Sequence, residues 1–182
     1  MRALKASEVE VRVGTVGKNG VTLLLYKNAR VDMQILDETF GTMGWQRDHK
    51  EVKGNLYCGI GVRCPEGWVW KWDCGTESNT EKEKGEASDS FKRAGFCWGI
   101  GRELYTSPFV FLPIKTEESN GRYKVRNPKD VYNLYVSHMV VTEGKDGVKT
   151  ITELDIAQRD RGNKSFIIWS TDKRKEGIDI YE

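Results

Sequence analysis

The stretch that decides the fold is Thr76–Arg102, which reads TESNTEKEKGEASDSFKRAGFCWGIGR. Ser78 and Thr80 each precede a glutamate by three residues, a spacing typical of a capping box at the start of a helix. The segment closes on Gly99-Ile100-Gly101, which follows a helical pattern rather than a strand and therefore indicates a helix exit. The stretch predicts one long helix with a polar, acidic beginning.

The predicted helix has one apolar face. Apolar residues recur at intervals of four, three and four, at Ala87, Phe91, Ala94 and Trp98. At about 100° per residue they share a narrow stripe, and Lys92 and Arg93 fall well away from it. Two interpretations of this pair stay open: ordinary solvated surface charges, or cations presented to a ligand.

Three β-prone runs precede the helix and are joined by short turns. They are Gln46–Val52, Leu56–Cys64 and Trp68–Cys74. Short turns between successive strands favour an antiparallel meander, which leads directly into the helix. The sequence therefore predicts an α+β fold, in which an antiparallel β-meander packs on a long helix and further strands follow toward the C-terminus.

The last of these runs carries three tryptophans at alternate positions. Trp68, Trp70 and Trp72 share one face of the strand, while Lys71 points to the other. We expect the tryptophan face to pack under the helix, because that would bury a large aromatic area. The alternative is an exposed platform on which bases stack.

An earlier helix is predicted from Ala29 to Phe40, with Asn28 as its cap and Gly41 at its end. Its inward residues would be Val31, Ile35, Leu36 and Phe40. Arg30 lies in the first turn, which is the unfavourable end of the helix dipole for a cation. A bound anion is one candidate for what holds Arg30 there.

The remainder of the chain is divided by composition. We predict a core over residues 1–105, and over residues 106–182 a linker and strands that pack on the same domain. Thr106–Asp130 contains three prolines and predicts an irregular surface linker. β-Prone runs follow at Val131–Thr142, Lys149–Ala157 and Ser165–Ser170, and the charged tail from Thr171 is expected to fray.

Composition limits the function classes. The 182 residues carry a net charge of +2, which suits one compact domain and leaves any DNA site to local segregation of charge. The N-terminus has no apolar run typical of a signal peptide, and no segment approaches a membrane-spanning length. We expect a cytoplasmic protein, in a bacterial cytoplasm or nucleoid or in a phage-infected cell.

No motif indicates an enzyme. The four cysteines, Cys58, Cys64, Cys74 and Cys97, form no CxxC pair, so reduced structural thiols are expected and a zinc site is not. Gly14–Lys18 fails the spacing of a phosphate-binding loop. The acidic residues from Glu81 to Asp89 spread around a helix and favour a solvated first turn over a metal site. We therefore predict neither a cofactor nor a catalytic residue.

Two blocks of residues resemble the Rad52/Rad22 single-strand annealing family of recombination mediators. The first is Arg30-Val31 with Phe40-Gly41 and Gly44-Trp45. The second contains Gly75, the acidic helix start, Ala87, Asp89, Phe91-Lys92-Arg93-Ala94, Trp98 and Gly99. The resemblance spans about Val21–Tyr105. The short length of the chain and the end of this stretch, ASDSFKRAGFCWGIGRELY, are similar to the phage and bacterial branch.

The resemblance implies a β-β-β-α core that assembles into homo-oligomeric rings with single-stranded DNA in an outer groove. It implies phosphate contacts from Arg30, Lys92 and Arg93. Phe96 stands where the family often carries another basic residue, so a contact is lost there or replaced by a stacking surface. Met43 stands where an aromatic residue sometimes precedes the Gly-Trp step. The candidate DNA-binding set is completed by Lys71, Arg102 and Trp45.

The implied function is annealing of complementary single strands in homologous recombination and double-strand-break repair, without ATP. The alternative is an accessory module that coats single strands or loads a recombinase but does not anneal. Expected partners are single-stranded DNA, further copies of the chain, and a single-strand binding protein or a recombinase; no membrane partner is expected. Two further alternatives are a nuclease and a protein that shares this fold but has no nucleic-acid role.

Overall fold

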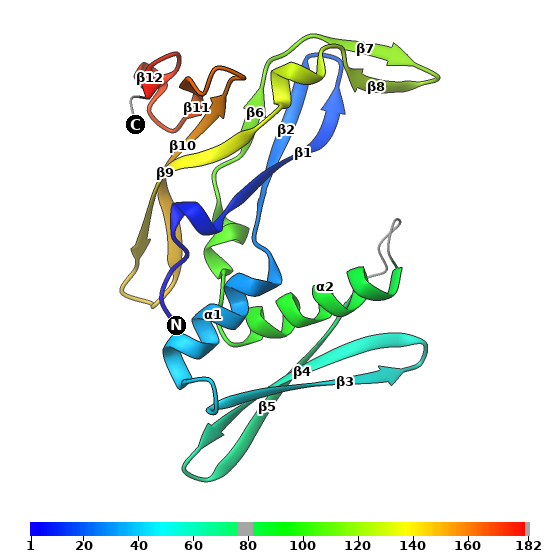
Figure 1. Cartoon of the computed structure of the whole chain (residues 1–182), viewed down its shortest axis with the longest axis vertical. Helices are drawn as coiled ribbons and strands as arrows, with labels where there is room; N and C mark the ends of the chain where they lie inside the picture. Colours follow the sequence, from blue (N-terminus) through cyan, green and yellow to red (C-terminus); the bar gives the residue numbers. More distant parts are fainter. Residues whose placement is uncertain (76–81, 181–182) are drawn as a thin grey trace. The chain divides into compact units, whose positions relative to one another are not determined.

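The computed structural model describes residues 1–75 and 82–180 and shows mostly antiparallel strands with two α-helices in those ranges (Figure 1). The predicted α+β class is confirmed. The predicted cap residues Ser78, Thr80 and Glu81 lie outside the described residues.

The chain divides into two compact units. Unit 1 consists of Met1–Ala3 and Asn28–Arg102, and unit 2 consists of Leu4–Lys27 and Glu103–Glu182. The expected core over residues 1–105, with residues 106–182 packed on the same domain, stays a prediction. Residues 4–27 nevertheless belong with the C-terminal part, because their two strands join its sheet.

Helix α1 of unit 1 spans Ala29–Phe40, as predicted. The Asn28 side chain accepts hydrogen bonds from the backbone N–H groups of Arg30 and Val31, which would otherwise lack a helical acceptor. Gly41 ends the helix with a φ of 75°, a conformation that glycine adopts without strain. Val31, Ile35 and Leu36 are buried, and Phe40 is half-buried.

A three-stranded antiparallel sheet and helix α2 complete unit 1. Its strands are β3 (Trp45–Val52), β4 (Asn55–Cys64) and β5 (Gly67–Cys74), in the order β3-β4-β5, and α2 spans Lys82–Cys97. The three strands predicted from the sequence are confirmed to within one residue at each end. Helix α2 lies along one face of the sheet, where Cys58, Ile60 and Val62 of β4 are buried (Figure 1).

The tryptophans of β5 point away from α2, so the expectation that they pack under the helix is wrong. Lys71 Nζ donates a hydrogen bond to the Cys97 carbonyl at 3.1 Å, which fixes the Lys71 side of β5 as the side of the helix. Trp70 pairs with Gly61 and Trp72 with Gly59. The reason lies in β4, whose apolar side chains are on one face and whose glycines are on the other. The helix packs on the apolar side chains.

Unit 2 is built on a seven-stranded antiparallel sheet in the order β12-β11-β10-β9-β1-β2-β6. Its strands are β1 (Glu10–Gly17), β2 (Gly20–Tyr26), β6 (Val110–Leu112), β9 (Leu134–Glu143), β10 (Lys149–Arg159), β11 (Ser165–Ser170) and β12 (Asp179–Ile180). A hairpin is formed by β7 (Thr116–Ser119) and β8 (Arg122–Val125). Four 3₁₀ helices occur in the described residues: η1 (Ala6–Glu8), η2 (Arg102–Thr106), η3 (Pro128–Val131) and η4 (Lys173–Lys175).

Two sequence expectations fail in unit 2. The predicted surface linker contains β6, the edge strand that pairs with β2, and its Val110 and Leu112 are buried. The charged tail is not frayed over its described length, because β12 pairs with β11. In both places a short strand forms by pairing with another strand of the sheet. The partner of β6 lies far away in the sequence, and that of β12 lies one loop away.

Candidate nucleic-acid interface

Lys92 and Arg93 lie on the outward side of α2. Their neighbours Phe91 and Ala94 are buried, whereas Lys92 and Arg93 are half-buried. The helix is anchored by those buried residues, so both cations are held in place while their charged ends reach the surface. The outward placement expected from helical periodicity is confirmed.

Arg93 makes an ion pair one turn along the helix. Its Nε lies 3.1 Å from Asp89 Oδ2, with side-chain exposures of 43% and 31%. An ion pair this exposed contributes on the order of 0.2–1 kcal/mol, because water screens it. A phosphate oxygen can therefore compete with Asp89 for the guanidinium group at little cost.

Arg30 is exposed in the first turn of α1, and that turn packs against α2. A Cβ atom placed on Gly95 would lie only 2.4 Å from Oδ1 of the buried Asp32, so the two helices approach closely here. Asp32 is two residues from Arg30, and Gly95 is two residues from Arg93. The helix contact therefore brings the turn that carries Arg30 beside the half of α2 that carries Lys92 and Arg93.

Two further predicted cations converge on the C-terminal end of α2. Arg102 donates from Nε to the Phe96 carbonyl at 2.9 Å and from Nη2 to the Cys97 carbonyl at 3.1 Å. Lys71 Nζ shares the Cys97 carbonyl. Cations are favourable at this end of a helix, where carbonyl groups lack helical donors. Both side chains stay exposed, so they cap the helix and add positive charge to the surface.

Phe96 lies beneath Arg102. The guanidinium carbon of Arg102 is 5.4 Å from the centroid of the Phe96 ring, within cation–π range. The place one turn after Arg93, where the resemblance to the annealing family led us to expect a basic side chain, thus holds a phenyl ring with an arginine over it. A positive charge is present at this place although it comes from another part of the sequence.

Trp45 is held inside unit 1 on two sides. Its indole Nε1 donates to Asp37 Oδ1 at 2.7 Å, and its ring lies 6.0 Å from the ring of Phe91. These contacts join β3 to both helices, so Trp45 has a packing role. A contact between Trp45 and DNA stays a prediction.

The guanidinium of Arg47 lies 5.4 Å from the Phe91 ring and adds an exposed cation on the helix side of β3. Sequence reasoning missed Arg47, although its alternation with Trp45 was a usable signal.

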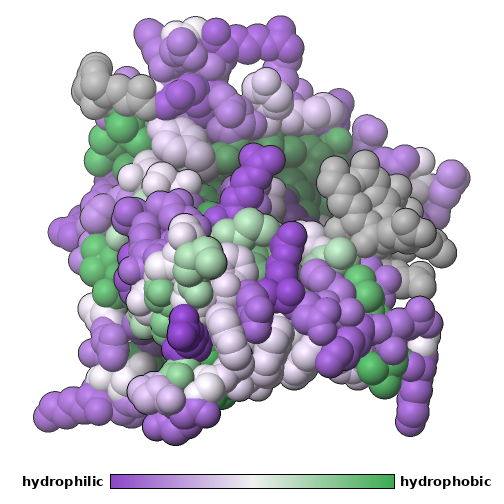
Figure 2. Space-filling view, turned by 60° about the horizontal axis from the view of Figure 1, so that its bottom comes forward, coloured by the Kyte–Doolittle hydropathy of each residue, from purple (hydrophilic) through white to green (hydrophobic). Residues whose placement is uncertain are grey.

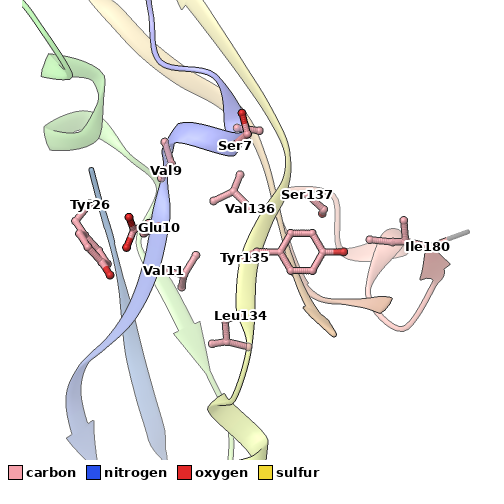
Figure 3. A pocket seen from close by; sticks show the side chains of 11 residues that line it. Ser7, Val9, Glu10, Val11, Tyr26, Leu134, Tyr135, Val136, Ser137 and Ile180 are labelled. Carbon is pink, nitrogen blue, oxygen red and sulfur yellow. The ribbon is translucent and has the colours of Figure 1, made fainter. Parts of the chain in front are cut away.

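One pocket of the described residues lies in unit 2, and none of the residues predicted to bind DNA lines it. It has a volume of about 760 Å³ and lies where β1 and β9 pair only through Glu10 and Tyr135. Val11, Leu134 and Val136 point into the space between the two strands (Figure 3). Tyr26 points toward Glu10, whose carboxylate accepts a hydrogen bond and so raises the pKa of the Tyr26 hydroxyl, with burial as a second cause. This lining is mostly apolar and does not suit a phosphate backbone.

Among the described residues, no three histidine, cysteine or carboxylate side chains gather in an arrangement that could hold a metal ion. None of the helices in residues 1–75 and 82–180 combines the length and the apolar character needed to cross a bilayer.

Comparison with known proteins identifies the family. The model of the Rad52/22 family of double-strand break repair proteins matches residues 1–123. No curated protein and no solved structure matches the chain. The family match begins before the resemblance noted at Val21 and continues beyond Tyr105, so it includes β1, β2, β6, β7 and the start of β8 in unit 2. Since it covers well over half of the sequence, this chain belongs to the Rad52/22 family of double-strand break repair proteins.

Proposed function

We propose that the protein binds single-stranded DNA through its phosphates and anneals complementary strands during recombination and double-strand break repair, without ATP. The proposal is supported by the cations that unit 1 carries at its surface, which we call the cation cluster. They are Arg30 on α1, Lys92 and Arg93 on α2, and Arg102 and Lys71 at the C-terminal end of α2.

The chemistry of the cluster suits annealing. Lysine and arginine bind phosphate oxygens, arginine through a planar fork, and such contacts carry no base information. A strand held by its backbone keeps its base edges free to test a complement. Formation of the duplex itself then supplies the free energy, so no nucleotide hydrolysis and no catalytic residue is required.

The near-neutral net charge of +2 argues for action as an oligomer. Five cations on one unit bind a flexible strand weakly at physiological salt, because screening and counterion release limit each contact. Repetition of the same cluster around a homo-oligomer, which we propose to be a ring, would raise the affinity through a high effective concentration.

The test is a strand-pairing assay. Two complementary oligonucleotides, one labelled with a fluorescent donor and the other with an acceptor, are mixed with purified protein. The buffer contains a metal chelator and no nucleotide. The proposal predicts pairing faster than the spontaneous rate. Lys92→Ala with Arg93→Ala should remove the acceleration, while circular dichroism and light-scattering mass stay unchanged.

A matched control keeps the charge change constant. Arg161→Ala with Lys164→Ala removes two exposed cations from a turn of unit 2 and should leave pairing fast. Tight binding by the unaltered protein without faster pairing would instead support the coating module, the second candidate. Equal effects of the two double variants would refute the assignment of the cluster.

A further inference from the structure

The face of the β3–β5 sheet opposite α2 carries a row of tryptophans. Trp68, Trp70 and Trp72 occupy successive outward positions of β5. Trp68 is 42% exposed, and the rings of Trp70 and Trp72 stack with centroids 5.7 Å apart. Large aromatic side chains are costly to leave in water, so their presence on an outer face calls for a ligand or a partner.

Two glycines of β4 form the bed on which these rings lie. A Cβ atom on Gly59 would stand 2.5 Å from the Trp72 ring, and one on Gly61 would stand 2.7 Å from the Trp70 ring. The indoles therefore rest directly on backbone, which no other residue type would permit. The result is a low, flat aromatic surface rather than a set of projecting side chains.

Cations flank this surface at both ends. Lys50 Nζ lies 4.5 Å from the centroid of the Trp72 ring, and it also lies 3.7 Å from Asp48 in an exposed ion pair. At the other end, Arg63 is exposed and pairs in register with Trp68. Figure 2 shows one side of the whole molecule, on which hydrophilic side chains cover most of the surface. Aromatic rings between cations match a nucleic-acid strand better than an apolar protein surface.

We infer that this outer face, defined by Lys50, Arg63, Trp68, Trp70 and Trp72, binds the bases of single-stranded nucleic acid by stacking. Side chains two residues apart on a strand are separated by roughly 6.6 Å, about twice the 3.4 Å rise per nucleotide of a stacked strand. Successive tryptophans would thus contact every second base of a stacked strand, or successive bases of an extended one.

This surface is distinct from the cation cluster, since the two lie on opposite faces of the same sheet. The inference rests on the proposed function only in the choice of a single strand as ligand. Unit 1 would then hold one stretch of nucleic acid by its phosphates and another by its bases. Stacking on a π face tolerates every base, so the second contact also carries little sequence information.

The experiment combines a protein change with a DNA change. Binding of full-length protein to oligo(dT) and to an abasic oligonucleotide of equal length is measured by fluorescence anisotropy. Trp68→Ala should weaken binding of oligo(dT) by about 5- to 140-fold, the range found for loss of one base–aromatic stack. It should leave binding of the abasic strand unchanged, because that strand offers phosphates but no rings. Trp68→Phe, which keeps a stacking ring, should bind oligo(dT) nearly as well as the unaltered protein.

A second readout does not depend on affinity. Oligo(dT) should quench the tryptophan fluorescence of the unaltered protein. The quenching should fall strongly when all three outer tryptophans become phenylalanine, to what Trp45, Trp98 and Trp169 contribute. Undiminished quenching in that variant would overturn the inference.

The outcomes separate this inference from the proposed function. Equal weakening of both oligonucleotides by Trp68→Ala would refute base stacking. A changed light-scattering mass with unchanged DNA affinity would assign the face to contact between copies of the chain, which also overturns the inference. Neither result affects the Lys92 and Arg93 experiment. Conversely, a strong fall in quenching in the phenylalanine variant would support the outer face even if the strand-pairing assay failed.

Discussion

The salt dependence of DNA binding gives a quantitative test of the cation cluster. Lys92 and Arg93 are half-exposed on α2, and each can neutralise one phosphate of a bound strand. For single strands, the slope of log K against log salt is about −0.7 per phosphate neutralised. Lys92→Ala with Arg93→Ala should therefore make the slope shallower by about 1.4. Between 50 and 200 mM salt, the unaltered protein should lose about sevenfold more affinity than the variant.

The assay is fluorescence anisotropy of labelled oligo(dT) at a fixed protomer concentration, so that oligomer formation does not distort the comparison. Arg161→Ala with Lys164→Ala changes the net charge by the same amount and should keep the original slope. Ion pairing of Arg93 with Asp89 reduces the effect only slightly, because both side chains are partly exposed. An unchanged slope in the α2 variant, or the same change in the control, would refute the phosphate contacts.

Further predictions concern the scaffold. Gly95→Ala places a methyl group against Asp32 and should lower the free energy of unfolding by about 1–3 kcal/mol. Urea denaturation measures this change, and an unchanged midpoint would contradict the close approach of the two helices. Trp45→Phe removes the hydrogen bond to Asp37 and should cost about 1.5–3 kcal/mol of stability; weaker DNA binding at unchanged stability would instead indicate that Trp45 contacts the strand. Burial raises the pKa of the Cys58 thiol from 9.0 to about 11, so the folded state retains a proton there that the unfolded state loses. Its contribution to stability should be complete below pH 9 and fall away up to about pH 11, and a Cys58→Ala variant should show a smaller loss over that range.

The sequence alone predicted the elements of unit 1 well. The capping residue Asn28, the glycine at the end of α1 and the turns between the strands act locally, so they can be recognised without tertiary contacts. The outward direction of Lys92 and Arg93 also followed from the 3.6-residue period. These features depend on neighbours within a few positions along the chain.

The strands of unit 2 were predicted unevenly. β10 and β11 were recognised from their own β-prone runs. β6 and β12 are short, and each forms because another strand offers unpaired backbone groups: the distant β2 for β6, and β11, one loop away, for β12. The run of β6 is β-prone but lies between Pro108 and Pro113, and β12 lies in a charged tail, so the surrounding sequence indicated irregular structure at both.

In the candidate site, too, some features could be predicted from the local sequence and others depended on tertiary contacts. Period-two alternation placed Trp68, Trp70 and Trp72 on one face, but it could not say which face meets α2. That was decided by pairing with β4, whose Ile60 faces the helix while Gly59 and Gly61 face outward. The alternation of apolar side chains and glycines in β4 was a usable signal for this choice.

Arg102 is the other case in which tertiary structure was needed. It lies over Phe96 and donates to the last carbonyls of α2, a position that depends on how the chain turns after Gly101. The sequence by itself determined which residues are charged, which are aromatic and which face of each element they share. Only the tertiary structure determined which faces are covered and which charges meet, because a face is buried by whatever packs against it and not by its own sequence.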